Sequence, residues 1–255
     1  MNHFQAIGQL ISRMELLEKP LQERGDARRH FHGTYLRTTR AVGDELAAGG
    51  FVDPEWVERW DVAFADLYLE ALVADQQGER PSGPWRVAFA AADHQADTLP
   101  PLRHVLLGMN AHINYDLPQA LLAVISDAEF DDPELLERRE ADHRHIDVVL
   151  TARVGAEDTR LDSVSARRSL IDRGLTPLNQ LGTKRFLRES RAKVWGNARR
   201  LAMARRQGEA AYAKELAELE RLTAERVADL TKPGQVILKL AAKGFGVLLP
   251  GAEPR

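Results

Sequence analysis

The sequence predicts an all-α protein, a single-domain multi-helix bundle with a buried central helix near 100–126. Three observations predict this class. The chain is punctuated by helix start and stop signals. It shows no sustained alternation of apolar and polar residues and no Asn-Gly hairpin turn. Its 255 residues, 44% hydrophobic and 29% charged, are typical of a globular protein with a sizeable core.

The punctuation defines the elements in order. Gly49-Gly50 closes one helix, and Asp53 and Pro54 supply an N-cap and a first-turn proline for the next. Asp132 and Pro133 repeat this device. The loop RPSGPW leads into a further helix, and TKPGQ is a late break.

The expected helices span about 3–19, 26–48, 54–76, 84–93, 100–126, 133–153, 183–206, 208–231 and 234–247. Residues 154–182 receive no firm assignment. We treat 1–255 as one helical domain, with a core at 1–153 and a C-terminal helical extension at about 183–250.

Composition excludes several classes of site. Because the chain has no cysteine, disulfides, thiolate nucleophiles and Cys-type metal sites are ruled out. A net charge of −3 gives no general attraction to nucleic acid or anionic membranes. The N-terminus lacks the features of a signal peptide, and no apolar run is long enough for a transmembrane segment, so a cytoplasmic location is expected.

One stretch is strongly basic. Residues 184–206 contain nine Lys or Arg and one Glu. The stretch is either a basic face that attracts an acidic ligand or partner, or an ordinary solvated helix surface.

The central helix carries polar residues that a buried helix should not contain without a reason. On a helical wheel, His104, Gly108, His112 and Asp116 form a ladder along one side. Tyr115 and Gln119 fall in the same sector: these six positions form a first polar group.

A second polar group lies on the apolar side of the same helix and consists of Asn110 and Asn114. Buried amides need partners, so these two are expected to bond to another helix or to free backbone groups. Pro118 frees one such group because it cannot donate to the carbonyl of Asn114, and it predicts a kink.

His112 and Asp116 are spaced i, i+4, which places an imidazole and a carboxylate side by side. Such a pair can hold a metal ion or orient a histidine that transfers a proton. It can also be a simple hydrogen bond that satisfies both groups.

Asp61 is a second unusual carboxylate, because it falls inside the apolar face of its helix. A buried carboxylate needs a cation or several donors. Asp61 is therefore either a third metal ligand or the partner of Arg37 or Arg40.

His143 and Asp147 repeat the i, i+4 spacing, but the arginines around them predict an exposed face. No G-x-S-x-G, G-x-G-x-x-G or P-loop motif is present, which argues against a nucleophile elbow and against standard nucleotide sites.

The segment GMNAHINYDLPQAL resembles part of the zinc-dependent phospholipase C and single-strand nuclease superfamily, whose members are all-α and bind a zinc cluster through His and Asp. This resemblance implies that His112 and Asp116 are metal ligands. The sequence departs from the pattern at Leu122, where the family has a further His, and at the N-terminus, where the family has a Trp ligand. On a longer scale, residues 26–150 resemble an uncharacterised bacterial family of helical proteins, which implies a fold but no activity.

The resulting hypothesis is a metal-dependent hydrolase for a phosphoester or other small substrate. In it, His112, Asp116 and Asp61 hold zinc, iron or manganese, and His104 and Tyr115 act as catalytic residues.

Two alternatives are a non-catalytic binding or scaffold protein and a metal-free enzyme. The latter would hold an apolar small molecule in a pocket lined by Tyr35, Tyr68, Tyr115, Phe64 and Trp85. The apolar C-terminus, 236–249, is expected to dock on the helical body or to form a homodimer.

Overall fold

The computed structural model describes the backbone of residues 4–164, 176–234, 244 and 246–254, and it describes the side chains of these residues except 150–164 and 176–188. Within these ranges every regular element is a helix. The predicted all-α bundle is therefore confirmed.

The α-helices are α1 Gln5–Glu23, α2 Arg29–Ala47, α3 Pro54–Gln76, α4 Gly83–His94, α5 Pro101–Ala111, α6 Leu117–Val124, α7 Pro133–Val164, α9 Thr176–Gln207 and α10 Glu209–Thr231. A π-helix, η1 His112–Asp116, separates α5 from α6, and a short 3-10 turn, η2 Glu129–Asp131, precedes α7. Most boundaries lie within a few residues of the expected ones. α7 and α9 extend into the stretch that received no assignment: α7 continues through Gly155, and Pro177 lies in the first turn of α9.

The helix starts follow the predicted capping chemistry. The Asp53 side chain accepts a hydrogen bond from Trp56 N–H at 3.1 Å, with Pro54 as the first helical residue of α3. Asp132 accepts from the N–H groups of Glu134 and Leu135 at the start of α7. At the end of α2, Gly49 has a φ of 75°, a left-handed conformation that favours glycine.

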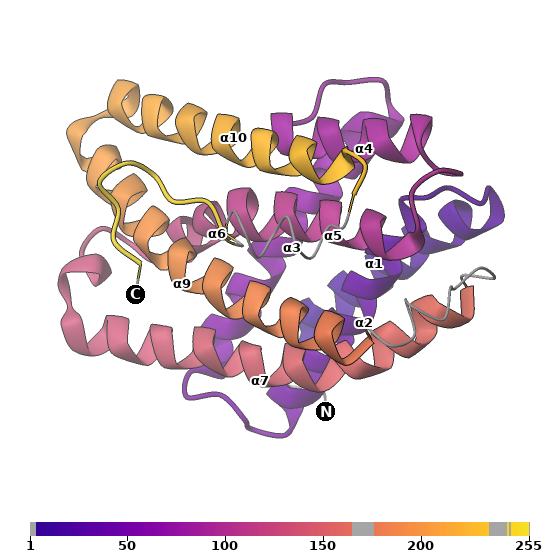
Figure 1. Ribbon diagram of the computed structural model, residues 1–255. Coiled ribbons are helices and arrows are strands. Elements are labelled where there is room, and N and C mark those ends of the chain that lie inside the picture. The colour runs from indigo at the N-terminus through magenta and orange to yellow at the C-terminus, as the bar shows by residue number, and fades with distance from the viewer. Residues whose placement is uncertain (1–3, 165–175, 235–243, 245, 255) are drawn as a thin grey trace.

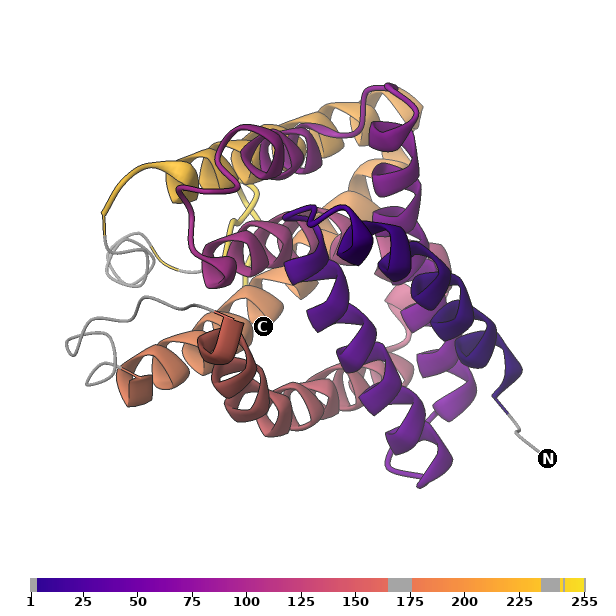
Figure 2. The same cartoon turned by 90° about the vertical axis from the view of Figure 1, so that its right-hand side faces the viewer.

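The central helix lies between two layers (Figure 1). α4 and α10 run above it and α9 and α7 below it, while α1, α2 and α3 close the remaining side, as the second view shows (Figure 2). α9 packs on α6 and α7, and α10 packs on α4 and α5. The segment expected as an extension therefore contributes directly to the core around the central helix.

The central helix changes its pitch at His112–Asp116, where it becomes a π-helix. The Leu117 N–H donates to the carbonyl of His112, five residues earlier. The irregular turn directly precedes Pro118, which was expected to kink the helix. A π-turn adds residues to one turn and so displaces side chains from the positions of a regular wheel; such turns often occur at functional sites.

The C-terminal segment docks on the helical body. Val247 and Leu249 are buried at 7% and 1% exposure. Residues 234, 244, 246 and 247 are not helical, so the helix expected over 234–247 is wrong at these positions; 235–243 and 245 lie outside the described residues.

None of the helices that the structure describes is both long and apolar enough to cross a membrane.

Candidate functional site: a buried His–Asp pair in an aromatic chamber

His112 and Asp116 form a hydrogen-bonded pair that Trp85 completes. Asp116 Oδ2 accepts from Trp85 Nε1 at 2.8 Å and lies 2.8 Å from His112 Nδ1. The three side chains come from α4 and from the two ends of η1, and all are buried. Because one carboxylate oxygen serves both nitrogens, the imidazole is fixed with Nδ1 toward Asp116 and Nε2 toward the opposite side.

Burial controls the protonation of this pair. It lowers the pKa of His112 well below the usual value and raises the pKa of Asp116 well above it, against the opposing effect of the Trp85 hydrogen bond. The imidazole is therefore uncharged at neutral pH. A neutral histidine that donates from Nδ1 carries its lone pair on Nε2, which is the form that acts as a base.

Aromatic rings enclose the imidazole. Phe64 stacks on it with centroids 3.5 Å apart and planes within 4°. Tyr35 meets it edge-on at 4.6 Å. Three further rings lie 5.9–6.0 Å from it: Phe31, Tyr68 and Trp85. Four of the five residues expected to line an aromatic pocket thus meet around His112.

Three buried polar atoms at this chamber have no hydrogen-bond partner among the described residues: Tyr35 Oη, His112 Nε2 and Asp61 Oδ2. Burial, followed by the charges of Asp61 and Asp116, raises the pKa of Tyr35, which keeps the phenol protonated and shows that both carboxyl groups are near. Buried polar atoms are normally paired in native proteins. Buried polar atoms without protein partners are suited to bind a polar group of a ligand.

Asp61 is buried, as expected, but its cation is Arg191 of α9 rather than Arg37 or Arg40. Arg37 donates to Thr34, and Arg40 pairs with Glu15. Burial raises the pKa of Asp61 to about 7, and the attraction of Arg191 opposes this rise. The carboxyl group can therefore gain or lose a proton near neutral pH.

A second polar cluster adjoins Asp61. His143 is only 2% exposed and lies between Trp60 and Trp195, with ring centroids 5.2 and 5.4 Å away. Arg191 pairs with Asp147 at 2.7 Å and donates to the His143 carbonyl at 2.6 Å. The exposed face predicted for His143 and Asp147 is therefore wrong, because α9 covers this side of α7.

His104 and Tyr115 occupy separate places. His104 is buried on α5 and stacks on His30 at 6.1 Å, and its Nε2 has no partner in the described part of the chain. Tyr115 lies close to Glu220 and Tyr212 of α10, and burial raises its pKa. Tyr115 belongs to the π-turn, and the ring contacts found around His112 among the described residues do not include it. The catalytic roles of both residues stay predictions.

The two asparagines have partners, as expected. Asn110 Nδ2 donates to the Leu106 carbonyl at 2.9 Å, and Asn114 Nδ2 contacts Asn110 Oδ1 at 3.3 Å. Asn114 Oδ1 accepts from the N–H of Val247 in the C-terminal segment at 3.3 Å. On α9, Asn197 holds the same segment through Val247 and Leu249. These amides anchor the C-terminus to the core.

The predicted metal ligands fit an ion in part. Among the described residues, no three His, Cys, Asp or Glu side chains are grouped so that they could hold a metal ion. Asp116 is engaged by Trp85 and His112, and Asp61 interacts with Arg191. Of these three side chains, His112 has a ring nitrogen, Nε2, that is not hydrogen-bonded to a described residue and could coordinate an ion. The ligand roles of His112, Asp116 and Asp61 stay predictions.

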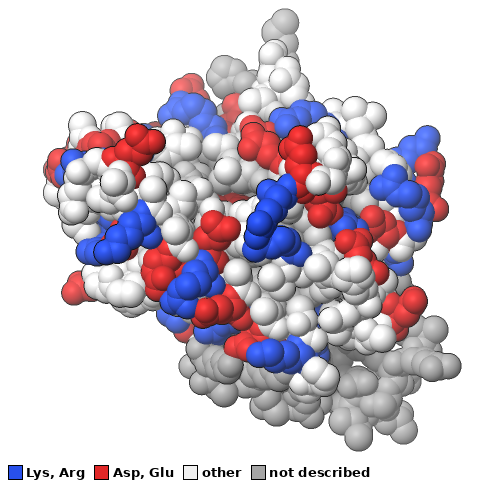
Figure 3. Space-filling view, turned by 90° about the horizontal axis from the view of Figure 1, so that it is seen from above, with Lys and Arg blue, Asp and Glu red and all other residues white. Residues whose placement is uncertain are grey.

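The basic stretch is neutralised where its side chains are described, from 189 to 206. Carboxylates pair with its cations: Arg191–Asp147, Lys193–Glu189, Arg200–Glu215, Arg205–Asp127 and Arg206–Asp131. On the face seen in Figure 3, acidic and basic side chains are interspersed. These pairs favour a structural surface over an attractant for anions.

Comparison with known proteins identifies the family. The model of the Family of unknown function (DUF5995) matches residues 7–233. The chain belongs to this family. No curated protein and no solved structure matches it. The expected relation to an uncharacterised helical family is confirmed over a longer range than 26–150, whereas the resemblance to the zinc-dependent phospholipase C and single-strand nuclease superfamily stays a prediction.

Sequence reasoning missed the part of this DUF5995 site that comes from α9. Arg191 reads as one cation of a basic run, and no local signal shows that it is buried beside Asp61. The sequence offers no signal that assigns Trp60 and Trp195 to a site. Their contacts with His143 depend on helix packing across long sequence separations, which a single sequence does not display.

Proposed function

We propose that the protein is a metal-free enzyme that transfers a proton to or from a small, largely apolar molecule, with His112 as the base. One observation carries this proposal. His112 is oriented by Asp116 and Trp85, while its Nε2 has no partner among the described residues.

The arrangement suits general base catalysis. A neutral imidazole presents the Nε2 lone pair to a substrate proton, and Asp116 in its ionised form stabilises the imidazolium that results. The substrate's C–H or O–H bond breaks, its proton goes to Nε2, and its electron pair moves into the substrate.

Tyr35 and Asp61 complete the chemistry. The Tyr35 hydroxyl, which burial keeps protonated, can donate a hydrogen bond to the oxygen that gains electron density. Asp61, with a pKa of about 7, can exchange a proton with that region. The surrounding rings favour a flat, apolar substrate with one or two polar atoms.

The experiment uses nitrobenzisoxazole, a flat aromatic compound that opens to a coloured cyanonitrophenolate when a base removes its ring proton. We expect the protein to accelerate this reaction, with a loss of about a hundredfold in kcat/KM in His112→Gln and a smaller loss in Asp116→Asn. His94→Gln is the matched control, since His94 lies exposed at the end of α4. Equal rates for the native protein and His112→Gln would contradict the proposal.

A metal-dependent hydrolase is the second candidate, and a specific observation favours it. Metal-ligating histidines commonly donate their other ring N–H to a carboxylate, and His112 Nδ1 lies 2.8 Å from Asp116 Oδ2, the distance such a bond requires. A bound ion would activate water for attack on a phosphoester. Metal analysis of untagged protein separates the candidates. About one equivalent of zinc, iron or manganese that is lost in His112→Gln supports the hydrolase. A proton-transfer rate that is insensitive to chelator supports the first proposal.

A further inference from the structure

A small cavity lies beside the His112 chamber, between α2, α4 and α5. Phe31, Tyr68 and Trp85 line it, and the same three rings surround His112. Its volume of about 20 Å³ gives room for one water-sized sphere. The cavity and the chamber thus share an aromatic wall.

Small residues create this space. Ala27, Ala88 and Ala92 line the cavity at positions where larger apolar side chains would fill it. Gly108 allows the closest approach, because a Cβ there would lie 2.3 Å from the Phe31 ring. On the side toward His112, the Phe31 ring therefore packs directly against the backbone of α5.

Two residues that line this cavity have a buried nitrogen without a hydrogen-bond partner among the described residues: Arg28 at Nε and His104 at Nε2. His104 is 5% exposed. Burial, with the nearby Arg29 and Arg103 charges, lowers the pKa of His104, so the ring is neutral. A neutral imidazole can form one hydrogen bond with a hydroxyl group in an otherwise apolar cavity.

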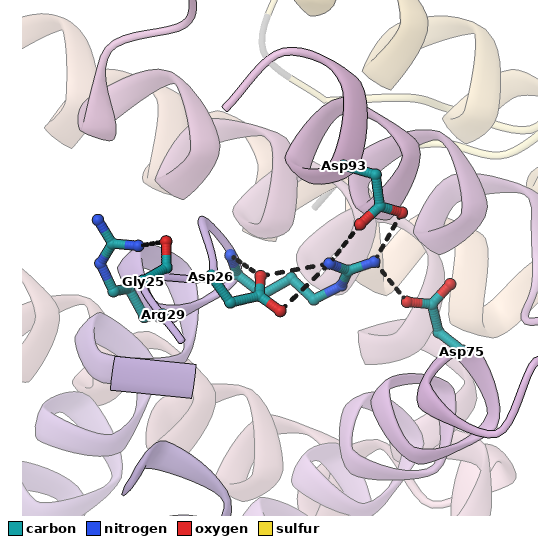
Figure 4. Close-up of polar contacts among 6 residues, drawn as sticks. Gly25, Asp26, Arg29, Asp75 and Asp93 are labelled. Carbon is teal, nitrogen blue, oxygen red and sulfur yellow. Dashed lines mark hydrogen bonds and ion pairs between the residues drawn. The ribbon is translucent and has the colours of Figure 1, made fainter. Parts of the chain in front are cut away.

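Arg28 closes the cavity at its outer end. Its guanidinium lies 5.3 Å from the centre of the Phe89 ring. It pairs with Asp75 of α3 at 2.7 Å, Asp93 of α4 at 2.7 Å and Asp26 at 3.2 Å, which Figure 4 shows gathered around it. The Asp93 side chain is 47% exposed, so this pair is the one most accessible to water.

We propose that this cavity is a ligand subsite for a small apolar alcohol or phenol. The hydroxyl binds His104, the ring packs against Phe31 and Trp85, and the ion pairs of Arg28 open to admit the molecule and enlarge the cavity. A role of this subsite in catalysis rests on the proposed function of His112. Ligand binding in the cavity is independent of that proposal.

Fluorophenol and fluorobenzene are the probes, because they differ by the hydroxyl group. Fluorophenol should shift the isotope-labelled methyl signals of Ala27, Ala88 and Ala92 in a saturable way. It should bind about tenfold more tightly than fluorobenzene, the effect of one hydrogen bond to a buried group. Fluorophenol that binds without moving these methyl signals, or that does not bind, would overturn the proposal.

Variants of His104 and Asp93 sharpen the test. His104→Leu should reduce the preference for fluorophenol over fluorobenzene to about onefold, and His104→Gln, which keeps a polar group, should retain part of it. Asp93→Asn should speed probe exchange, measured from ¹⁹F line shapes. Asp66→Asn, which breaks a surface pair with Arg13 on another face, is the control. An unchanged preference in a folded His104→Leu protein would also overturn the proposal.

The same probes separate this inference from the proposed function. Fluorophenol that moves the three methyl signals and competes with nitrobenzisoxazole supports both. Fluorophenol that moves them while nitrobenzisoxazole is not turned over leaves the subsite standing and removes the catalytic role of His112. Competition without movement of the methyl signals places the ligand elsewhere and overturns the subsite.

Discussion

The two polar groups of the central helix differ in how their hydrogen bonds are met. Asn110 and Asn114 form hydrogen bonds with the Leu106 carbonyl, with each other and with the backbone of Val247. On the other side, His112 uses Nδ1 for Asp116, while its Nε2 and the neighbouring Tyr35 hydroxyl have no partner among the described residues.

This difference separates structure from function. Paired buried amides fix helix register and hold the C-terminal segment, so their loss costs stability. Buried polar atoms without hydrogen-bond partners lower the stability of the fold. They are expected where a ligand or a reaction uses them. Each prediction below tests one side of this comparison.

Removal of the C-terminal segment should have the largest effect. Truncation after Pro233 exposes the sites of Val247 and Leu249, each worth about 1.5–3 kcal/mol when buried. It also removes the hydrogen-bond partners of the Asn114 and Asn197 side chains, at a cost of about 1–3 kcal/mol for each amide left unpaired. The sum is comparable to the net stability of a domain. We expect aggregation or a large fall in Tm, measured by calorimetry. Truncation after Leu249 is the control and should be mild. Unchanged melting after the longer truncation would show that the segment does not anchor to the core.

Asp61→Asn should change how stability depends on pH. The folded state holds the Asp61 proton up to about pH 7, whereas the unfolded chain loses it near 3.8, so the free energy of unfolding falls as pH rises through this window. The full penalty, at most about 4 kcal/mol, is present above pH 7. The variant should therefore be more stable than the native protein at about pH 8 and similar at about pH 4, in urea unfolding at both values. A native protein whose stability does not fall relative to the variant would refute the raised pKa.

The fold was more predictable from sequence than the site. Two helix starts are encoded locally by an N-capping aspartate followed by a first-turn proline, Asp53 with Pro54 and Asp132 with Pro133. Both starts are found as expected. The wheel of the central helix correctly paired His112 with Asp116 and separated Asn114, but a regular wheel cannot show that His112–Asp116 is a π-turn. Arg191 could not be assigned to Asp61, since that electrostatic interaction links residues of α3 and α9 that are far apart in the sequence.

Asn114→Leu should lower stability by about 1–3 kcal/mol, because Val247 N–H and Asn110 lose a buried partner. The rate with nitrobenzisoxazole should not change. Thermal melting and kcat/KM measured on the same sample test both expectations. Full stability together with lost activity would show that the two sides of the helix have the opposite roles.

Tyr35→Phe should raise stability slightly, by about 1 kcal/mol, since it removes a buried hydroxyl without a described partner. It should also reduce kcat with nitrobenzisoxazole. Tyr68→Phe is the matched control, because its hydroxyl bonds to His32 Nδ1 at 2.9 Å and its loss should destabilise. If both variants lower the stability of the protein equally, the Tyr35 hydroxyl has a hydrogen-bond partner in solution. The rings around His112 would then be part of the hydrophobic core and not a ligand site.

The protonation state of His112 tests the central claim most directly. ¹⁵N NMR of the imidazole distinguishes a protonated nitrogen from a free one. We predict that between about pH 6 and pH 8 Nδ1 carries the proton and Nε2 is unprotonated, because Asp116 orients the ring and burial lowers the pKa of His112. A ring that is doubly protonated in this range, or one with its proton on Nε2, would contradict the assignment of His112 as an oriented free base.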